Sequence, residues 1–136
     1  MFVGDQMNVD LINVITLAYL GDSIYEVYVR EYLINEGIAK VEDLQKEAVK
    51  YVSAKSQCKI LEYLINNNML TEEEMDVVKR GRNYKRASHP KNTDIITYKM
   101  SSGFEAMIGY LYLNNNKDRL DEIMNYILGG SYEKDS

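Results

Sequence analysis

Two carboxylates, Asp22 and Glu105, stand in surroundings that are unusual for acidic residues. On a helical wheel Asp22 falls at the edge of a wide apolar arc, without a basic partner one turn away, so we expect it to be partly buried. Glu105 is the only acid between Ile95 and Lys117, and small residues surround it. A buried carboxylate is costly unless it is paired or bound to metal, so both could converge on a hard cation. Alternatively, Glu105 hydrogen-bonds a tyrosine or serine of a facing helix.

Positive charge is concentrated in one stretch of an otherwise acidic chain. The net charge of −5 argues against a protein that coats nucleic acid. From Lys79 to Lys99, however, seven basic residues face a single acid, Asp94, which leaves the remainder of the chain strongly negative. Such a cluster is either a solvated loop or a surface for phosphate, and its density favours phosphate.

The remaining reactive side chains exclude several kinds of site. One cysteine, Cys58, and one histidine, His89, cannot supply the four ligands of a closed zinc site, and they carry no local signature of a nucleophilic pair. A single histidine also excludes a ferritin-like di-iron centre. No phosphate-binding loop of the Gly-x-x-x-x-Gly-Lys type is present in the sequence.

An acidic cluster at Glu72, Glu73, Glu74 and Asp76 suggests either a metal site or the start of a helix. Thr71 and Glu74 have the spacing of a capping box, and carboxylates are favoured in a first helical turn by the helix dipole. We therefore favour the helix start. A helical nucleotide pyrophosphohydrolase that uses the cluster remains a weaker alternative.

The elements that must position these residues are helical, so we predict an all-α fold. Apolar residues recur at spacings of three and four, period-two alternation is absent, and the single proline, Pro90, lies in the basic stretch. We expect helices over 11–20, continuing after a break or bend at Gly21 to about Gly37, then over 41–52, 54–67, 71–79, from a cap at Asn92 or Thr93 to 113, and over 118–128.

The length of 136 residues fits one domain, which we place at residues 9–130 between an N-terminal extension, 1–8, and a tail, 131–136. The apolar runs are far shorter than the roughly 20 residues that span a bilayer. The first eight residues lack the basic region of a secretory signal, and one cysteine forms no intrachain disulfide. We therefore expect a cytoplasmic protein.

Two segments resemble a known family. Tyr19-Leu20-Gly21-Asp22-Ser23 is similar to the Phe-Leu-Gly-Asp-Ser signature of ribonuclease III catalytic domains. Phe104-Glu105-Ala106-Met107-Ile108-Gly109 is similar to the family's second acidic motif, Glu-Ala-Leu-Ile-Gly. The segments 52–57, 79–83 and 90–94 resemble the short Mini-ribonuclease III branch, which lacks the double-stranded RNA-binding domain. The similarity extends from about residue 11 to residue 128.

The chain departs from ribonuclease III proper at three positions where that family carries further acids. Those positions are occupied here by Ile15, Ala18 and Ser102. Only Asp22 and Glu105 can therefore be matched to the family's acidic ligands, and this reduced set fits the Mini branch.

The resemblance implies a homodimeric, Mg²⁺-dependent endonuclease for double-stranded RNA, in which each subunit cuts one strand with Asp22 and Glu105 as catalytic metal ligands. For the Mini branch it implies maturation of the ends of precursor large-subunit (23S) ribosomal RNA, with a ribosomal protein as a further partner. The basic stretch would then hold the RNA, through Arg82, Asn83, Lys85, Arg86 and Lys91. A non-catalytic helical RNA-binding or ribosome-associated module is the alternative.

Overall fold

The computed structural model describes residues 8–85, 91, 94–129 and 132, and within these ranges it contains helices and no strand, which confirms the all-α prediction. None of the described helices is both long and apolar enough to cross a bilayer. The elements are a 3₁₀ turn, Val9–Leu11, and the helices α1 (Val14–Asn35), α2 (Val41–Val52), α3 (Ala54–Asn66), α4 (Glu72–Asn83), α5 (Ile95–Leu113) and α6 (Lys117–Leu128).

The helix boundaries differ from the sequence prediction at several points, and the first helix begins at Val14 rather than at residue 11, because residues 9–11 form a separate 3₁₀ turn. Of the break or bend expected at Gly21, a break is wrong, because α1 continues through it as one helix. The α4 helix ends at Asn83 rather than near residue 79. The cap of α5 is Asp94, whose side chain accepts from the Thr97 amide at 2.9 Å, whereas the expected caps at residues 92 and 93 lie outside the described residues. The capping box at Thr71 and Glu74 is confirmed.

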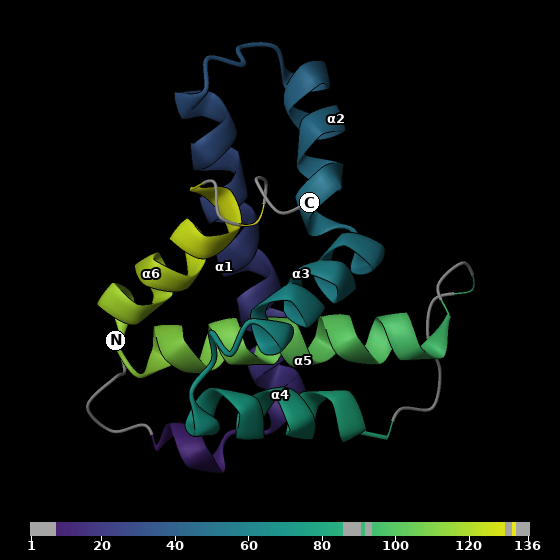
Figure 1. Ribbon diagram of the computed structural model, residues 1–136, viewed down its shortest axis with the longest axis vertical. Coiled ribbons are helices and arrows are strands. Elements are labelled where there is room, and N and C mark those ends of the chain that lie inside the picture. The colour runs from purple at the N-terminus through teal and green to yellow at the C-terminus, as the bar shows by residue number, and fades with distance from the viewer. Residues whose placement is uncertain (1–7, 86–90, 92–93, 130–131, 133–136) are drawn as a thin grey trace.

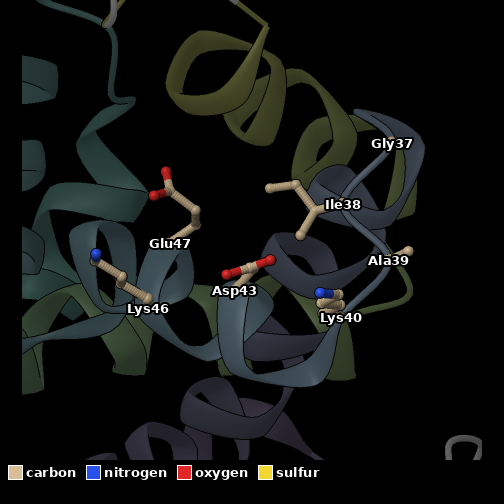
Figure 2. A pocket seen from close by; sticks show the side chains of 7 residues that line it. All are labelled: Gly37, Ile38, Ala39, Lys40, Asp43, Lys46 and Glu47. Carbon is tan, nitrogen blue, oxygen red and sulfur yellow. The ribbon is translucent and has the colours of Figure 1, made fainter.

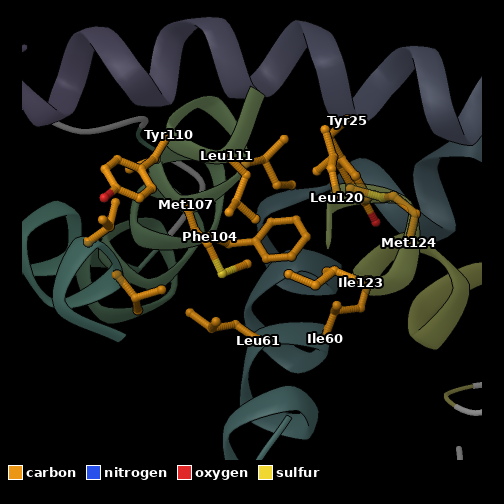
Figure 3. Close-up of a cluster of buried hydrophobic side chains, with 14 of the residues drawn as sticks. Tyr25, Ile60, Leu61, Phe104, Met107, Tyr110, Leu111, Leu120, Ile123 and Met124 are labelled. Carbon is orange, nitrogen blue, oxygen red and sulfur yellow. The ribbon is translucent and has the colours of Figure 1, made fainter. Parts of the chain in front are cut away.

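Helix α5 forms the centre of the molecule. Every residue from 101 to 111 is buried except Glu105, as is typical of a helix that is apolar around most of its circumference. Phe104 packs edge-on against Tyr25 of α1, with ring centroids 5.0 Å apart, and side chains of α3 and α6 complete this core (Figure 3). The helix is thus held on nearly all sides, and Glu105 is placed where the covering is incomplete.

Paired glycines bring α1 into backbone contact with α5, which it crosses steeply in Figure 1. A methyl group placed on Gly21 would lie 1.8 Å from the carbonyl oxygen of Glu105, and one placed on Gly109 would lie 2.0 Å from that of Leu17. Only a residue without a Cβ fits such an approach. The glycines of the two sequence motifs therefore create the crossing that brings Asp22 and Glu105 to the same region.

A second glycine pair sets α4 against α5, and the two helices lie side by side in Figure 1. A methyl group on Gly81 would lie 2.8 Å from the Cα of Gly103, and one on Gly103 would lie 2.6 Å from the carbonyl oxygen of Val78. The end of α4 that carries Arg82 and Asn83 is consequently fixed against the middle of α5.

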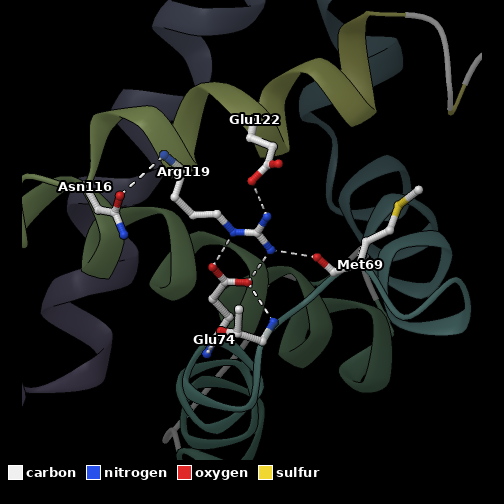
Figure 4. Close-up of polar contacts among 6 residues, drawn as sticks. Met69, Glu74, Asn116, Arg119 and Glu122 are labelled. Carbon is white, nitrogen blue, oxygen red and sulfur yellow. Dashed lines mark hydrogen bonds and ion pairs between the residues drawn. The ribbon is translucent and has the colours of Figure 1, made fainter.

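A buried ion pair ties α4 to α6 (Figure 4). The Arg119 guanidinium donates to both carboxylate oxygens of Glu74, at 2.7 and 2.8 Å, and to the Met69 carbonyl at 2.7 Å. The Thr71 amide also donates to Glu74, at 2.9 Å. Burial raises the pKa of the Glu74 carboxyl, but the hydrogen bonds from Arg119 and Thr71 outweigh that effect and leave the pKa below its ordinary value.

We expect Arg119→Met to lower the free energy of unfolding by about 3 kcal/mol at pH 7, because it leaves a buried carboxylate without its cation. The lowered pKa of Glu74 in the folded state stabilises the fold above the ordinary glutamate value, about 4.3. This contribution disappears as the pH falls through the lowered pKa. The difference between wild type and variant, measured by urea denaturation, should therefore shrink on acidification below about pH 4.

The control is the double variant Glu74→Met/Arg119→Met, which removes both charges and should recover part of the lost stability. A wild-type advantage that stays constant from pH 7 to pH 3 would contradict an ionised Glu74 as its source.

Candidate active site

Asp22 and Glu105 line one pocket, of about 400 Å³, where α1, the α2–α3 junction and α5 meet. It is mixed in character, with tyrosine and small apolar side chains beside the two carboxylates. Its walls are formed by Ile15, Ala18, Tyr19, Asp22, Val52, Ala54, Gln57, Tyr98, Ser101 and Glu105. The convergence that sequence spacing left undecided is therefore present in the fold.

The surroundings of Asp22 and Glu105 differ. Glu105 is half-buried, and its Oε2 accepts a hydrogen bond of 3.2 Å from the Gln57 amide of α3. The prediction that Asp22 is partly buried is wrong: its side chain is exposed at the edge of the pocket. The edge of the apolar arc on α1 that carries Asp22 thus borders this pocket and is not packed into the core.

Of the three positions at which ribonuclease III proper carries extra acids, two line this pocket and the third is buried in α5. Ile15 and Ala18 line the pocket, two turns and one turn before Asp22, and Ser102 is buried in α5. Within the described ranges, no group of three or more histidine, cysteine, aspartate or glutamate side chains is placed to hold a metal. The pocket thus offers two carboxylates, a donor set that fits a cation which retains several water ligands, such as Mg²⁺.

The residues predicted to hold RNA begin in the last turn of α4, with Arg82 and Asn83, and continue after it. Arg82 is half-buried and its Nε donates to the side chain of Asn83 at 3.4 Å, while Lys85 and Lys91 are exposed. Arg86 lies outside the described residues. After this stretch the chain enters α5, whose first turns contribute Tyr98 and Ser101 to the pocket. In the sequence, the positive segment is thus followed by the helix that carries Glu105.

Two other regions are poorer candidates. A hollow of about 540 Å³ lies between the end of α1 and the start of α2 (Figure 2), lined by Gly37, Ile38, Ala39, Lys40, Asp43, Lys46 and Glu47. Its charges are mixed in sign, and Glu47 already pairs with Lys50 at 3.0 Å. In the acidic cluster at the start of α4, Glu74 is committed to Arg119, which removes it from the proposed pyrophosphohydrolase site.

Sequence reasoning missed Gln57 as a site residue. It is only 1% exposed and lies on the face of α3 that also carries the buried Ile60, Leu61 and Leu64. A glutamine at a core position of an amphipathic helix is the signal that could have revealed it, because buried amides are retained where they find hydrogen-bond partners.

Comparison with known proteins agrees with this geometry. Residues 15–116 match the model of the ribonuclease III domain family. The Mini-ribonuclease 3 of Staphylococcus aureus is 46% identical over 121 residues, 89% of this chain and 90% of that protein. The Streptococcus pneumoniae Mini-ribonuclease 3 is 43% identical over 122 residues, covering 90% and 95%. A Fusobacterium nucleatum crystal structure superposes with a TM-score of 0.77 at 31% identity, covering 89% of this chain and 95% of the other.

Proposed function

The chain belongs to the ribonuclease III family, in its Mini-ribonuclease III branch, and on that premise we propose that it cleaves double-stranded RNA with a divalent cation held by Asp22 and Glu105. It is an endoribonuclease of the ribonuclease III type. The alternative of a non-catalytic RNA-binding or ribosome-associated module is therefore rejected. The observation that carries the proposal is the convergence of these two carboxylates, from opposite ends of the chain, on one pocket.

We propose Mg²⁺ as the cation, with Asp22 and Glu105 as its protein ligands. When bound, Mg²⁺ polarises the phosphodiester and makes a water molecule a stronger nucleophile. The chain contributes position: Gly21 fixes the backbone of Glu105, while Gln57 holds its carboxylate. Asp22 stands at the open edge of the pocket, where a cation that it held would be accessible to a phosphate of the RNA.

The direct test is cleavage of a long RNA duplex by the purified chain. We expect cutting in Mg²⁺, no cutting in EDTA, and no cutting of the same sequences as separate strands or as DNA duplex. Equal cleavage of single-stranded RNA would contradict the proposed substrate, and undiminished activity in EDTA would contradict the proposed cation.

We propose that Arg82, Asn83, Lys85, Arg86 and Lys91 contact the RNA, as a positive segment on a chain of net charge −5. A-form RNA is recognised mainly through its shape, phosphates and 2′-hydroxyls, so these contacts should be salt-sensitive. We expect Lys85→Gln/Lys91→Gln to reduce the slope of log affinity against log salt by about 1 for each phosphate that the variant no longer neutralises. Fluorescence anisotropy with a labelled duplex measures that slope.

The matched control replaces two lysines of equal charge in the α1–α2 hollow, Lys40→Gln/Lys46→Gln, which should leave the slope unchanged. If both pairs of replacements change the slope equally, the binding is a response to net charge and the assignment to the α4–α5 segment is wrong.

We further propose a homodimer that cuts both strands with two sites, and precursor 23S ribosomal RNA as the substrate. Tyr19 of α1, which lines the pocket, is 83% exposed, and Leu11 of the preceding 3₁₀ turn is 82% exposed. This exposed apolar surface supports contact with a second copy. Sedimentation at working concentrations should give twice the mass of one chain.

In a strain depleted of the protein, 23S precursors with unprocessed ends should accumulate, and normal ends would count against this substrate.

A further inference from the structure

The amide of Gln57 connects two parts of the pocket wall. Its Nε2 donates to the carbonyl oxygen of Val52, the last residue of α2, at 3.1 Å and to Glu105 Oε2 of α5 at 3.2 Å. Both partners are oxygen atoms that only accept, so the –NH₂ end of the amide must face them. The orientation of the side chain is thereby fixed.

The other end of the same amide is unsatisfied. Gln57 Oε1 is buried, and it has no hydrogen-bond partner among the described residues. A buried acceptor without a partner costs about 1–3 kcal/mol, so such atoms are rare in folded proteins and often mark functional positions. An apolar side chain of the same length would avoid that cost but would lose the bonds to Val52 and Glu105. Core packing alone therefore does not account for a glutamine here.

We propose that Gln57 is a positioning residue, which holds the Glu105 carboxylate in the orientation that binds the catalytic cation. The inference rests on the proposed function, since it takes Glu105 as a metal ligand. Gly21 restrains the backbone of Glu105, whereas Gln57 contacts its carboxylate directly, and a rotated carboxylate would lose the cation. The bond from Gln57 opposes that rotation. Residues that orient ligands in this way typically change metal affinity by about 10- to 100-fold.

The test compares four proteins: wild type, Gln57→Met, Glu105→Gln and Leu64→Met. Methionine matches glutamine in length but cannot donate to Glu105, and Leu64→Met is the control for a buried replacement two turns along the same face of α3. Each protein is titrated with MgCl₂ alone, and the Mg²⁺-dependent rise in melting temperature gives an apparent affinity without RNA. A second titration follows duplex cleavage.

For Gln57→Met we expect both midpoints to move to about 10- to 100-fold higher Mg²⁺, with cleavage largely restored at saturating Mg²⁺. Leu64→Met should match wild type. If Glu105→Gln loses the Mg²⁺ response while Gln57→Met keeps the wild-type midpoints, the positioning role is overturned and the proposed function stands. If Glu105→Gln itself keeps the wild-type midpoints, the positioning role and the proposed function are both overturned.

A second variant covers a failure of Gln57→Met to fold. Gln57→Asn keeps the amide but shortens the side chain by one methylene, which draws the donor away from Glu105. It should shift both midpoints in the same direction, and wild-type midpoints in a folded Gln57→Asn would overturn the proposal.

Discussion

Glu105→Gln and Asp22→Asn should each reduce the cleavage rate of duplex RNA by about 10³-fold, equivalent to about 4 kcal/mol of transition-state stabilisation. Each change keeps the shape of the side chain and removes the negative charge that holds the cation. Glutamine at 105 can still accept a hydrogen bond from Gln57, so the fold should persist. Single-turnover cleavage at saturating protein measures the effect, and anisotropy should show that RNA binding survives.

The control for the carboxylate variants is Glu26→Gln, one turn after Asp22 on α1. Its carboxylate pairs with Arg30 at 2.9 Å on the surface, so its loss should change cleavage little. The double variant Asp22→Asn/Glu105→Gln should be no slower than the worse single variant, because both act through the same ion. Fully multiplicative losses would indicate separate roles and would contradict one shared cation.

Gly109→Ala should abolish the folded site, with a loss of about 5 kcal/mol or more in the free energy of unfolding. The added methyl would meet the Leu17 carbonyl oxygen at 2.0 Å, and backbone atoms on both sides leave no flexible side chain to move. Helix α1 would have to separate from α5, and Asp22 would move away from Glu105. Urea denaturation followed by circular dichroism should show an early or non-cooperative transition, with no response of the melting temperature to Mg²⁺.

Gly37→Ala is the control for Gly109→Ala, because Gly37 is required for its backbone conformation and not for close helix approach. Gly37 has a positive φ of 95°, and a methyl group there would contact nothing within 4 Å. Its cost should be only that of the left-handed backbone, about 1–2 kcal/mol, with cleavage unchanged. Equal destabilisation by the two replacements would show that close approach of α1 and α5 is not what requires glycine at 109.

The differences between sequence prediction and structure have identifiable causes. Gly21 suggests a break because glycine weakens an isolated helix, yet here tertiary contact with Glu105 keeps α1 continuous. The partial burial expected for Asp22 failed because a helical wheel shows which residues share a face but not what covers that face. Gln57 was missed because its role depends on Glu105, 48 residues later in the chain.

The sequence by itself determined the helices, through the spacing of apolar residues and the capping box at Thr71. It also singled out Asp22 and Glu105 as the two acids in surroundings unusual for acidic residues. These are local patterns, which chain geometry converts directly into helix faces and ends. Only the tertiary structure decided that α1 and α5 touch at Gly21 and Gly109, and that Gln57 reaches Glu105. Such contacts depend on how helices that are far apart in the sequence pack together, and the spacing of residues along the chain does not specify that packing.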